Sequence, residues 1–447
     1  MVEGPQSVFS QASRLKKYIA SFGVFYGAFT FGICISFLNP TILDFSHKFD
    51  SPVDHVSKVF SVSLATYLVG ALAGGIILKF LNRQLFVMIM LTLMTLSLFT
   101  IPYANTEIEF FTLAGVMGLG NGGFDAAQLA WIIDIWRHEA APFILTQHFA
   151  VSVGRLVPPL LLGPFLSEEK EEGEAEFIIS TTSEPYQSRL HVPFAIGAAF
   201  ILVCLISQAA LYLFVFRPTK SNTNNVATQE TQEDKEKGDE STNELSQSGG
   251  ESLKRKILLI VLICCVLGFY QGMELCTAQF IPTFSHFSEV GLSEKQSARI
   301  ALGLQLGFAL GRLLGIFLVL KIAPHFLFAG NFLLLLASNI ILLICGGSSV
   351  EWLWVGSIAI GLGMSTVLPA VYAYIEKYIF VSDSIASIVA GFGGLVAFVY
   401  PIIVGNAVEY NPEVMTYVNF LSIAVCGVAS VALFYITHVR GSNKESI

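Results

Sequence analysis

The stretch FTLAGVMGLGNGGFDAAQLAWIIDIWR, residues 111–137, decides the fold that we expect for this chain. It is long and apolar enough to cross a bilayer, which takes about 20 apolar residues in a helix, yet it carries Asp125 near its middle. A carboxylate at mid-membrane costs roughly 2.5 to 3.5 kcal/mol on insertion scales, so it is rarely retained unless it faces a cavity or a partner. Asp125 is therefore the first functional candidate, and the plain alternative is that it pairs with an arginine to hold the helices together. Four glycines between residues 118 and 123 let a neighbouring helix or a ligand approach the backbone.

The composition of the whole chain indicates a membrane protein with several spans. Of its 447 residues, 54% are hydrophobic and 13% are charged, with a mean hydropathy of +0.67, whereas soluble domains carry about 25% charged residues. The net charge of -8 says little about partners, because much of the acid falls in two runs, 168–176 and 230–251, that we interpret as solvated loops. All seven cysteines fall in apolar stretches, where they act as small hydrophobic residues rather than as disulfide or metal ligands. Nothing here indicates nucleic acid as a partner.

Twelve apolar stretches are long enough to span a membrane as helices. They predict an all-α membrane protein with twelve transmembrane helices in two six-helix halves. The stretches cover residues 18–43, 59–78, 85–103, 110–136, 141–166, 192–216, 257–285, 300–320, 325–344, 352–375, 384–408 and 414–437. Four stretches carry one deep charge each, and charges inside a membrane are functional-site hypotheses by default. These four are Asp125, Arg155, Glu274 and Arg312.

A polar stretch between the sixth and seventh helices divides the chain. Residues 217–256 are rich in Asn, Thr, Glu, Ser and Gly without apolar periodicity, which predicts a disordered cytoplasmic linker. Lysine and arginine gather on the side of this linker, so the positive-inside rule places both chain ends in the cytoplasm. We expect a multi-pass protein of the plasma membrane. The expected units are the cytoplasmic tails 1–17 and 439–447, the linker 217–256, and the two halves 18–216 and 257–438.

The two halves share a pattern of small residues. Gly70 and Gly74 in the second helix are matched by Gly311 and Gly315 in the eighth, and a lysine follows each pair. Small residues four apart allow two helices to cross closely. Two six-helix halves joined by a long loop are the plan of major facilitator transporters, whose site lies between the halves near the midplane.

Several motifs occur along the membrane part in a fixed order. They are FLNPTILDF (37–45), GLGNGGFDAAQ (118–128), QHFAVSVGRLVPPLLLGPFL (147–166), Tyr270-x-Gly272-x-Glu274, Gly311-Arg312, and the set Gly361, Ser365 and Pro369. In this order they resemble the animal sodium-dependent glucose transporter family, a branch of the fucose:proton symporter group of major facilitators. The resemblance implies a secondary sugar transporter, and it puts Asp125 at the acidic position implicated in proton coupling in the bacterial symporters.

Several positions depart from the family pattern. Pro40 stands where the bacterial fucose symporters carry an aspartate in the first helix, so their relay of two acids does not carry over whole. Leu129 stands where the family has an asparagine, with Gln128 beside it, and Lys79 lies where the general loop motif has an aspartate. Arg155 stands where a small uncharged residue is expected. These departures leave the solute and the coupling ion, Na⁺ or H⁺, open.

Sugars are recognised by amides, hydroxyls and carboxylates, together with an aromatic face, in a largely apolar cavity. For each amide, the alternative is a hydrogen bond between helices, worth about 0.6 kcal/mol on average in membrane bundles. For the histidine, the alternative to carrying a proton is packing. The candidate solute-binding residues are Asn39, Asn121, Gln128, His148, Tyr270, Gln271, Glu274, Gln279 and Ser365.

Neither catalysis nor a resident cofactor is expected. The sequence has no phosphate-cradling G-x-x-x-x-G-K-[ST] motif and no cluster of His and Cys with metal-ligand spacing. Transport must then be driven by gradients, either as facilitated diffusion of the solute or by coupling to Na⁺ or H⁺. We expect a carrier for a hexose-type solute, monomeric in the lipid bilayer, that works by alternating access. A different class of function is a non-transporting nutrient sensor or scaffold that signals through the central loop, and an ion channel is a poorer third.

Roles for the deep charges follow from their depth. Arg312 lies some eight residues, or about 12 Å, from the cytoplasmic end of its helix, so we expect it to act in gating rather than in solute binding. Asp125 and Arg155 differ in depth by roughly 4 to 5 Å, which long side chains can bridge. We therefore predict a buried Asp125–Arg155 pair, with Asp125, Arg155 and Glu274 as the coupling residues. A paired carboxylate would stay charged and carry protons poorly, whereas an unpaired one could exchange a proton in each cycle.

Overall fold

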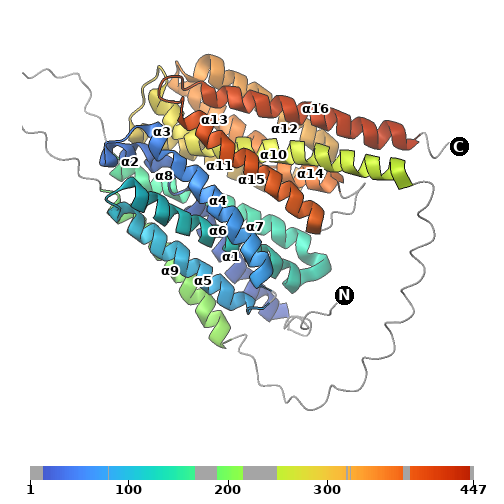
Figure 1. Cartoon of the computed structure of the whole chain (residues 1–447), viewed down its shortest axis with the longest axis horizontal. Coiled ribbons are helices and arrows are strands. Elements are labelled where there is room, and N and C mark those ends of the chain that lie inside the picture. Colours follow the sequence, from blue (N-terminus) through green and yellow to red (C-terminus); the bar gives the residue numbers. More distant parts are fainter. Residues whose placement is uncertain are drawn as a thin grey trace, which may run out of the picture.

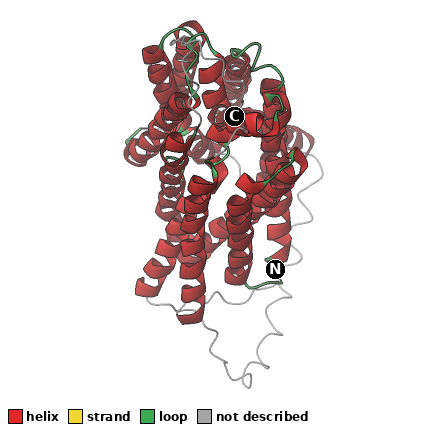
Figure 2. Cartoon of the chain, turned by 90° about the vertical axis from the view of Figure 1, so that its left-hand side faces the viewer, coloured by secondary structure: helices red, strands yellow, loops and turns green. Residues whose placement is uncertain are grey.

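The computed structural model describes most of the predicted membrane part as helices. The described residues are 14–78, 80–166, 189–214, 249–318, 321–322, 324–375 and 383–442. Within these ranges every regular element is a helix (Figure 2). Lys79 and most of the predicted linker and tails lie outside the described residues.

The first half comprises nine α-helices within the described ranges, some of them short. They are α1 Arg14–Ser36, α2 Ile42–Phe49, α3 Val53–Val56, α4 Lys58–Ile77, α5 Arg83–Thr100, α6 Glu107–Trp136, α7 Ala140–Gly154, α8 Val157–Leu162 and α9 His191–Phe214. Short turns of 3-10 helix join several of them, at Asn39–Thr41, Ile101–Tyr103, Arg137–Glu139 and Gly163–Phe165.

The second half has fewer and longer helices. They are α10 Gly249–Phe287, α11 Glu294–Leu318, α12 Pro324–Ile341, α13 Val350–Met364, α14 Val367–Ile375, α15 Asp383–Gly405 and α16 Val414–Ser442, with a π-helical turn at Leu342–Gly346. Eight helical segments of the described chain are long and apolar enough to cross a membrane on length and composition alone. Each of the twelve predicted stretches is matched by one helix or by successive helices, so the predicted all-α architecture is confirmed.

The predicted linker boundary is corrected. α10 begins at Gly249, inside the segment 217–256 that was predicted to be disordered. The residues before Ile257 read ESLKRK, and Glu, Leu, Lys and Arg are all good helix formers that prolong a helix once it is nucleated. At the other end, α16 runs to Ser442, past the predicted end of the second half at residue 438.

Prolines interrupt three of the membrane passes. The first pass breaks between α1 and α2 at the turn that contains Pro40. The fifth breaks between α7 and α8 just before Pro158 and Pro159, and the tenth between α13 and α14 just before Pro369. Proline lacks a backbone N–H, and its ring clashes with the carbonyl four residues earlier, so carbonyls are freed at each break. A helix thus ends at or just before each of these four prolines.

Glycines set the packing of helices inside each half. α4 and α6 cross so closely that a β-carbon on Gly70 would collide with the Leu119 carbonyl. In the second half, α11 approaches α13 in the same way, and a β-carbon on Gly311 would collide with Ser365 at the end of α13. Gly70 and Gly311, the first members of the two matched pairs, therefore serve equivalent close crossings.

The two halves lie side by side, the first coloured blue to green and the second yellow to red (Figure 1). They meet where α4 packs against α15 and where α7 and α8 pack against α11. The Ser61 hydroxyl of α4 donates to the Phe398 carbonyl of α15 at 2.9 Å. The rings of Phe60 in α4 and Phe280 in α10 are 5.5 Å apart.

Two further contacts join the halves at the end of the bundle that holds α2 and α3, away from both chain termini (Figure 1). The backbone N–H of Val53 donates to Glu409 Oε1 at 2.6 Å. His47 Nδ1 lies 3.5 Å from Glu294 Oε1. Side chains thus bridge the interface at this end.

Candidate functional site

A cavity of about 300 Å³ lies between the halves and is lined by both of them. This volume is at the small end of the range for ligand pockets, roughly 300 to 1,000 Å³. Its walls come from α1, α4, α6 and α7 of the first half and from α10, α11 and α14 of the second. Nine of the sequence-predicted site residues line it, namely Asn121, Asp125, His148, Arg155, Tyr270, Gln271, Glu274, Gln279 and Arg312.

An ion pair crosses the cavity from one half to the other. Arg155 Nη1 lies 3.1 Å from Glu274 Oε1, and the two side chains are only 11% and 12% exposed. Arg155 is placed there by the break between α7 and α8, and Glu274 projects from α10. The Tyr270 hydroxyl, one helical turn before Glu274, lies 2.8 Å from Glu274 Oε2 and also reaches the Met364 carbonyl, next to the α13–α14 break. Glu274 is thus held by Arg155 of the first half and by Tyr270 of its own helix.

The predicted Asp125–Arg155 ion pair is wrong. Asp125 instead accepts a hydrogen bond from the Tyr67 hydroxyl of α4, at 2.6 Å from its Oδ2. α6 packs against α4 through the glycine crossing, which brings Tyr67 beside Asp125, whereas Arg155 is drawn to Glu274 of the other half. In the described part of the chain, no basic side chain forms a salt bridge with Asp125.

Arg312 also reaches across to the first half. Its Nη1 donates to the His148 carbonyl at 2.6 Å and to the Ser152 hydroxyl at 2.9 Å, both on α7. The Phe308 ring, one turn earlier on α11, lies 4.4 Å from the Arg312 guanidinium and 5.5 Å from that of Arg155. Such cation–π contacts compensate part of the loss of water around a buried cation. Both arginines therefore tie α7 or its end to the second half.

The charges of the cavity are balanced between the halves. Each half contributes one acid and one arginine, Asp125 and Arg155 from the first and Glu274 and Arg312 from the second. Because the four formal charges sum to zero, the cavity as a whole does not select for a strongly charged solute. Of the two acids in this set, Glu274 forms a salt bridge and Asp125 forms none with any described residue.

Three amide oxygens in the cavity wall are buried without a hydrogen-bond donor among the described residues. They are Asn121 Oδ1 on α6, Gln147 Oε1 on α7 and Gln279 Oε1 on α10. A buried acceptor without a donor costs about 1 to 3 kcal/mol. These oxygens can therefore accept hydrogen bonds from hydroxyl or N–H groups of a solute.

Three predicted site residues do not line the cavity. Gln128 donates to the Val24 carbonyl at 2.9 Å and so joins α6 to α1, which is the helix-to-helix bond weighed as its alternative. Ser365 donates to the Leu362 carbonyl at 2.6 Å, and Asn39 is buried in the turn before α2.

Three residues that shape the site were missed in the sequence. Tyr67 is a lone phenol in the apolar second stretch, and Gln147 directly precedes His148 in the quoted fifth-helix motif, so both carried a weak signal. Phe308 carried none, because a phenylalanine four residues before an arginine is ordinary in an apolar helix.

Comparison with known proteins agrees with the architecture. The sequence model of the Major Facilitator Superfamily matches residues 24–401. Sodium-dependent glucose transporter 1 of Xenopus laevis is 23% identical over 80% of this chain and 69% of its own length. The human protein of that name is 22% identical over 78% of this chain and 65% of its own length.

One further relative and one solved structure are matched over more of their own length. Major facilitator superfamily domain-containing protein 4A of Xenopus tropicalis is 22% identical over 91% of this chain and 88% of its own length. The crystal structure of the nucleoside transporter NupG (D323A mutant) superposes with a TM-score of 0.61 at 14% identity, covering 93% of this chain and 99% of that one. At that identity the superposition shows the fold alone. The family match over most of the chain decides the identity: this protein belongs to the Major Facilitator Superfamily and is a membrane transporter of that type.

Proposed function

We propose that this transporter carries a small polar solute of hexose type by alternating access of its two halves. The observation that supports this most is the Arg155–Glu274 ion pair, which crosses between the halves inside the shared cavity. A bond that spans the two moving bodies at the solute site can be broken and remade in each cycle, which links solute occupancy to their relative position.

The chemistry of the cavity supports a solute rich in hydroxyl groups. The free oxygens of Asn121, Gln147 and Gln279 need donors, and a neutral sugar supplies several around its ring. The balanced charges argue against an anion or a cation as the main cargo. Two of the relatives carry glucose transporter in their names, which agrees with this solute class.

Asp125 is our proposed coupling residue for Na⁺ or H⁺. Its hydrogen bond from Tyr67 comes from an uncharged group, so the carboxylate is free of a fixed countercharge and can take up a cation or a proton in one state of the cycle. We assign gating to Arg312, since its bonds to the His148 carbonyl and the Ser152 hydroxyl tie α11 to α7 of the other half. We further propose that the protein works as a monomer in the plasma membrane with both termini in the cytoplasm.

Uptake into proteoliposomes tests the proposal. The purified full chain is reconstituted, and uptake of labelled D-glucose, a 6-deoxyhexose, a nucleoside and an amino acid is measured with an inward Na⁺ gradient, an inward H⁺ gradient, or neither. We expect saturable uptake of a hexose that exceeds uptake of the nucleoside and the amino acid. Saturable uptake of a non-sugar alone would overturn the solute class, and no saturable flux for any solute would favour the sensor or scaffold function.

A further inference from the structure

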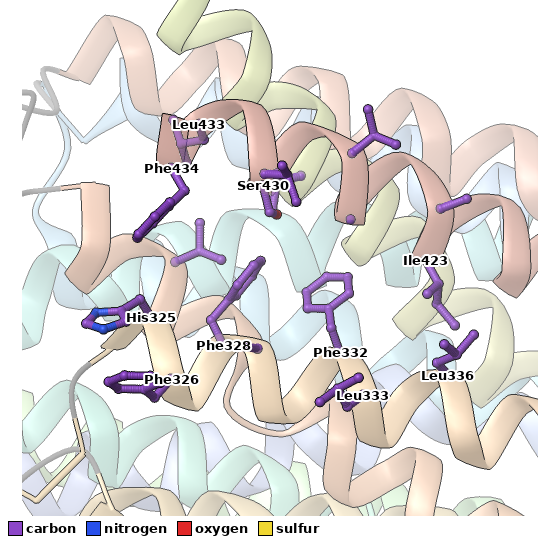
Figure 3. A pocket seen from close by; sticks show the side chains of 17 residues that line it. His325, Phe326, Phe328, Phe332, Leu333, Leu336, Ile423, Ser430, Leu433 and Phe434 are labelled. Atoms are coloured by element: carbon purple, nitrogen blue, oxygen red, sulfur yellow. The ribbon is translucent and has the colours of Figure 1, made fainter. Parts of the chain in front are cut away.

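A second and larger cavity, of about 740 Å³, lies between α12 and α16, away from the charged site. Figure 3 shows its side chains projecting from the two helices toward each other. Its floor is formed by Val266 of α10 and Val371 of α14, which are 1% and 3% exposed. Its rim, by contrast, opens outward, since Leu333 and Val428 are 69% and 73% exposed. This is a groove walled by four helices that opens on the outer surface of the second half.

The groove is open because small residues line its centre. A β-carbon on Gly427 of α16 would meet no atom within 4 Å, so this glycine faces free space. Ala329 of α12, facing the same groove, is exposed. Of the residues that line it, only His325 and Ser430 carry polar side chains. A polar solute therefore finds few partners here, whereas a hydrocarbon chain does.

The length of the groove matches one leaflet of a bilayer. Along α12 it runs from His325 to Leu336, and along α16 from Ile423 to Phe434, which at 1.5 Å per residue is about 16 Å. The hydrocarbon core of a bilayer is about 30 Å thick, so one leaflet accounts for about half of it. The groove thus has the length of an acyl chain within a single leaflet.

One end of the groove is polar, and a basic residue precedes that end along the chain. His325 lies in the first turn of α12, beside Phe434 of α16, with 6.4 Å between their ring centres (Figure 3). Lys321, in the turn just before α12, is exposed. A basic side chain beside the first turn of a membrane helix lies at headgroup level, where it attracts anionic phosphates.

We propose that this groove binds an anionic phospholipid of the leaflet that faces the chain termini, with one acyl chain between α12 and α16 and its phosphate beside Lys321 and His325. The site is separate from the solute cavity and does not depend on the transported solute. Because α12 packs against α14, a lipid in this groove also contacts the tenth pass. That pass breaks at Ser365, next to the Met364 carbonyl that the Tyr270 hydroxyl reaches.

Photo-crosslinking tests the proposal. The full chain in nanodiscs receives a trace of phosphatidylglycerol or phosphatidylcholine that carries a diazirine in one acyl chain, and labelled peptides are mapped by mass spectrometry. We expect phosphatidylglycerol to label α12 and α16 several-fold more than phosphatidylcholine. Gly427→Leu, which fills the groove, should reduce this labelling at least five-fold. Gly330→Leu, also on α12 with open space around its β-carbon but outside the groove lining, should leave it unchanged.

Two more variants keep the test decisive. Ala329→Leu fills the same groove from the opposite helix and replaces Gly427→Leu if that variant does not fold. Lys321→Gln should reduce the preference for phosphatidylglycerol over phosphatidylcholine at least three-fold. Equal labelling of the parent and both groove-filling variants would overturn the acyl-chain site. Equal labelling by the two lipids in the parent would overturn the anionic headgroup and leave ordinary boundary lipid.

Discussion

Arg155 and Glu274 form the central contact of the site, and each supplies the countercharge of the other. With side chains only 11% and 12% exposed, neither charge has much water to replace its partner. Breaking a buried pair by removing one member costs about 3 to 5 kcal/mol, whereas removing both is often close to neutral for stability. The pair can therefore be probed by comparing single and double substitutions.

Glu274→Gln should lower the melting temperature in detergent by several degrees and reduce solute uptake at least ten-fold, because it leaves Arg155 without its countercharge. The double variant Arg155→Gln with Glu274→Gln should recover most of the lost stability while uptake stays low. Thermal unfolding and initial uptake rates measure the two effects. A single variant as stable and as active as the parent would show that the ion pair contributes to neither stability nor transport.

Asp125→Asn should abolish gradient-driven accumulation of solute while exchange of labelled for unlabelled solute at equal concentrations continues. An amide keeps the size of the side chain and its contact with Tyr67 but cannot gain or lose a proton and carries no charge for a cation. Uptake and counterflow in the same proteoliposomes separate the two. Asp134→Asn, on the same helix but in an ion pair with Arg83, is the control and should keep accumulation. Accumulation by Asp125→Asn at the parental level would remove this residue from coupling.

Helix breaks and glycine crossings determine where these side chains point. The break after Gly154 leaves Arg155 between two helices, and the break after Met364 exposes a carbonyl to Tyr270. α11 is unbroken, but its Arg312 docks on α7 of the other half. Contacts between elements of different halves are the ones that must change when the halves move.

Arg312→Ala should slow turnover more than it weakens solute binding. The substitution removes two hydrogen bonds between α11 and α7 and leaves the amide acceptors of the cavity in place. We expect the maximal uptake rate to fall at least five-fold with less than a two-fold change in solute affinity. Arg299→Ala, at the exposed beginning of α11, should change neither quantity. Loss of affinity at an unchanged maximal rate would instead make Arg312 a solute-binding residue.

Gly70→Ala should destabilise the protein, whereas Gly75→Ala on the same helix should not. A β-carbon at position 70 collides with the Leu119 carbonyl, but at position 75 it meets nothing within 4 Å. Overpacking costs about 1 to 3 kcal/mol, while alanine in an open helical position gains about 0.5 to 1 kcal/mol over glycine. Melting temperatures of the two variants test this. Equal melting temperatures of the two variants would mean that the α4–α6 crossing can accommodate an added methyl group.

Taken as a whole, the molecule is two helical bodies that enclose a cavity with two acids and two arginines in its wall, and they are bridged at the end away from the termini. There the Val53–Glu409 and His47–Glu294 contacts join them, and Ser57, just before α4, lies against Gly405 of α15. Alternating access requires this end to open in another state of the cycle. Fixing it should therefore stop transport without harming the fold.

A Ser57→Cys, Gly405→Cys double variant should lose uptake on oxidation and regain it on reduction. A β-carbon placed on Gly405 would lie 3.1 Å from that of Ser57, close enough for a disulfide after a small adjustment. Each single variant, oxidised in the same way, controls for reaction of the native cysteines. Undiminished uptake with the crosslink formed would show that this end does not open.

The sequence alone was enough for the architecture. The lengths and apolar content of the stretches predicted all twelve passes, since a span must satisfy its backbone hydrogen bonds within one helix and so leaves a local signature. Pro40, Pro158, Pro159 and Pro369 lie at the breaks in three passes, whereas Pro282 and Pro401 lie inside continuous helices, so a proline alone does not locate a break. The deep charges likewise marked the cavity, because a buried ion is costly wherever its partner lies.

Only the tertiary structure decided which side chains pair with each other. Similar depths in the membrane suggested that Asp125 pairs with Arg155. Depth gives only the position along the membrane normal, however. The positions within the membrane plane depend on which helices face each other across the two halves. The meeting of the two halves placed Glu274 of α10 beside Arg155, and the α4–α6 crossing placed Tyr67 beside Asp125. The start of α10 at Gly249 escaped prediction because composition alone does not show where a nucleated helix ends. Local chemistry in the sequence thus specified which elements form, and the three-dimensional packing of distant elements specified which side chains meet.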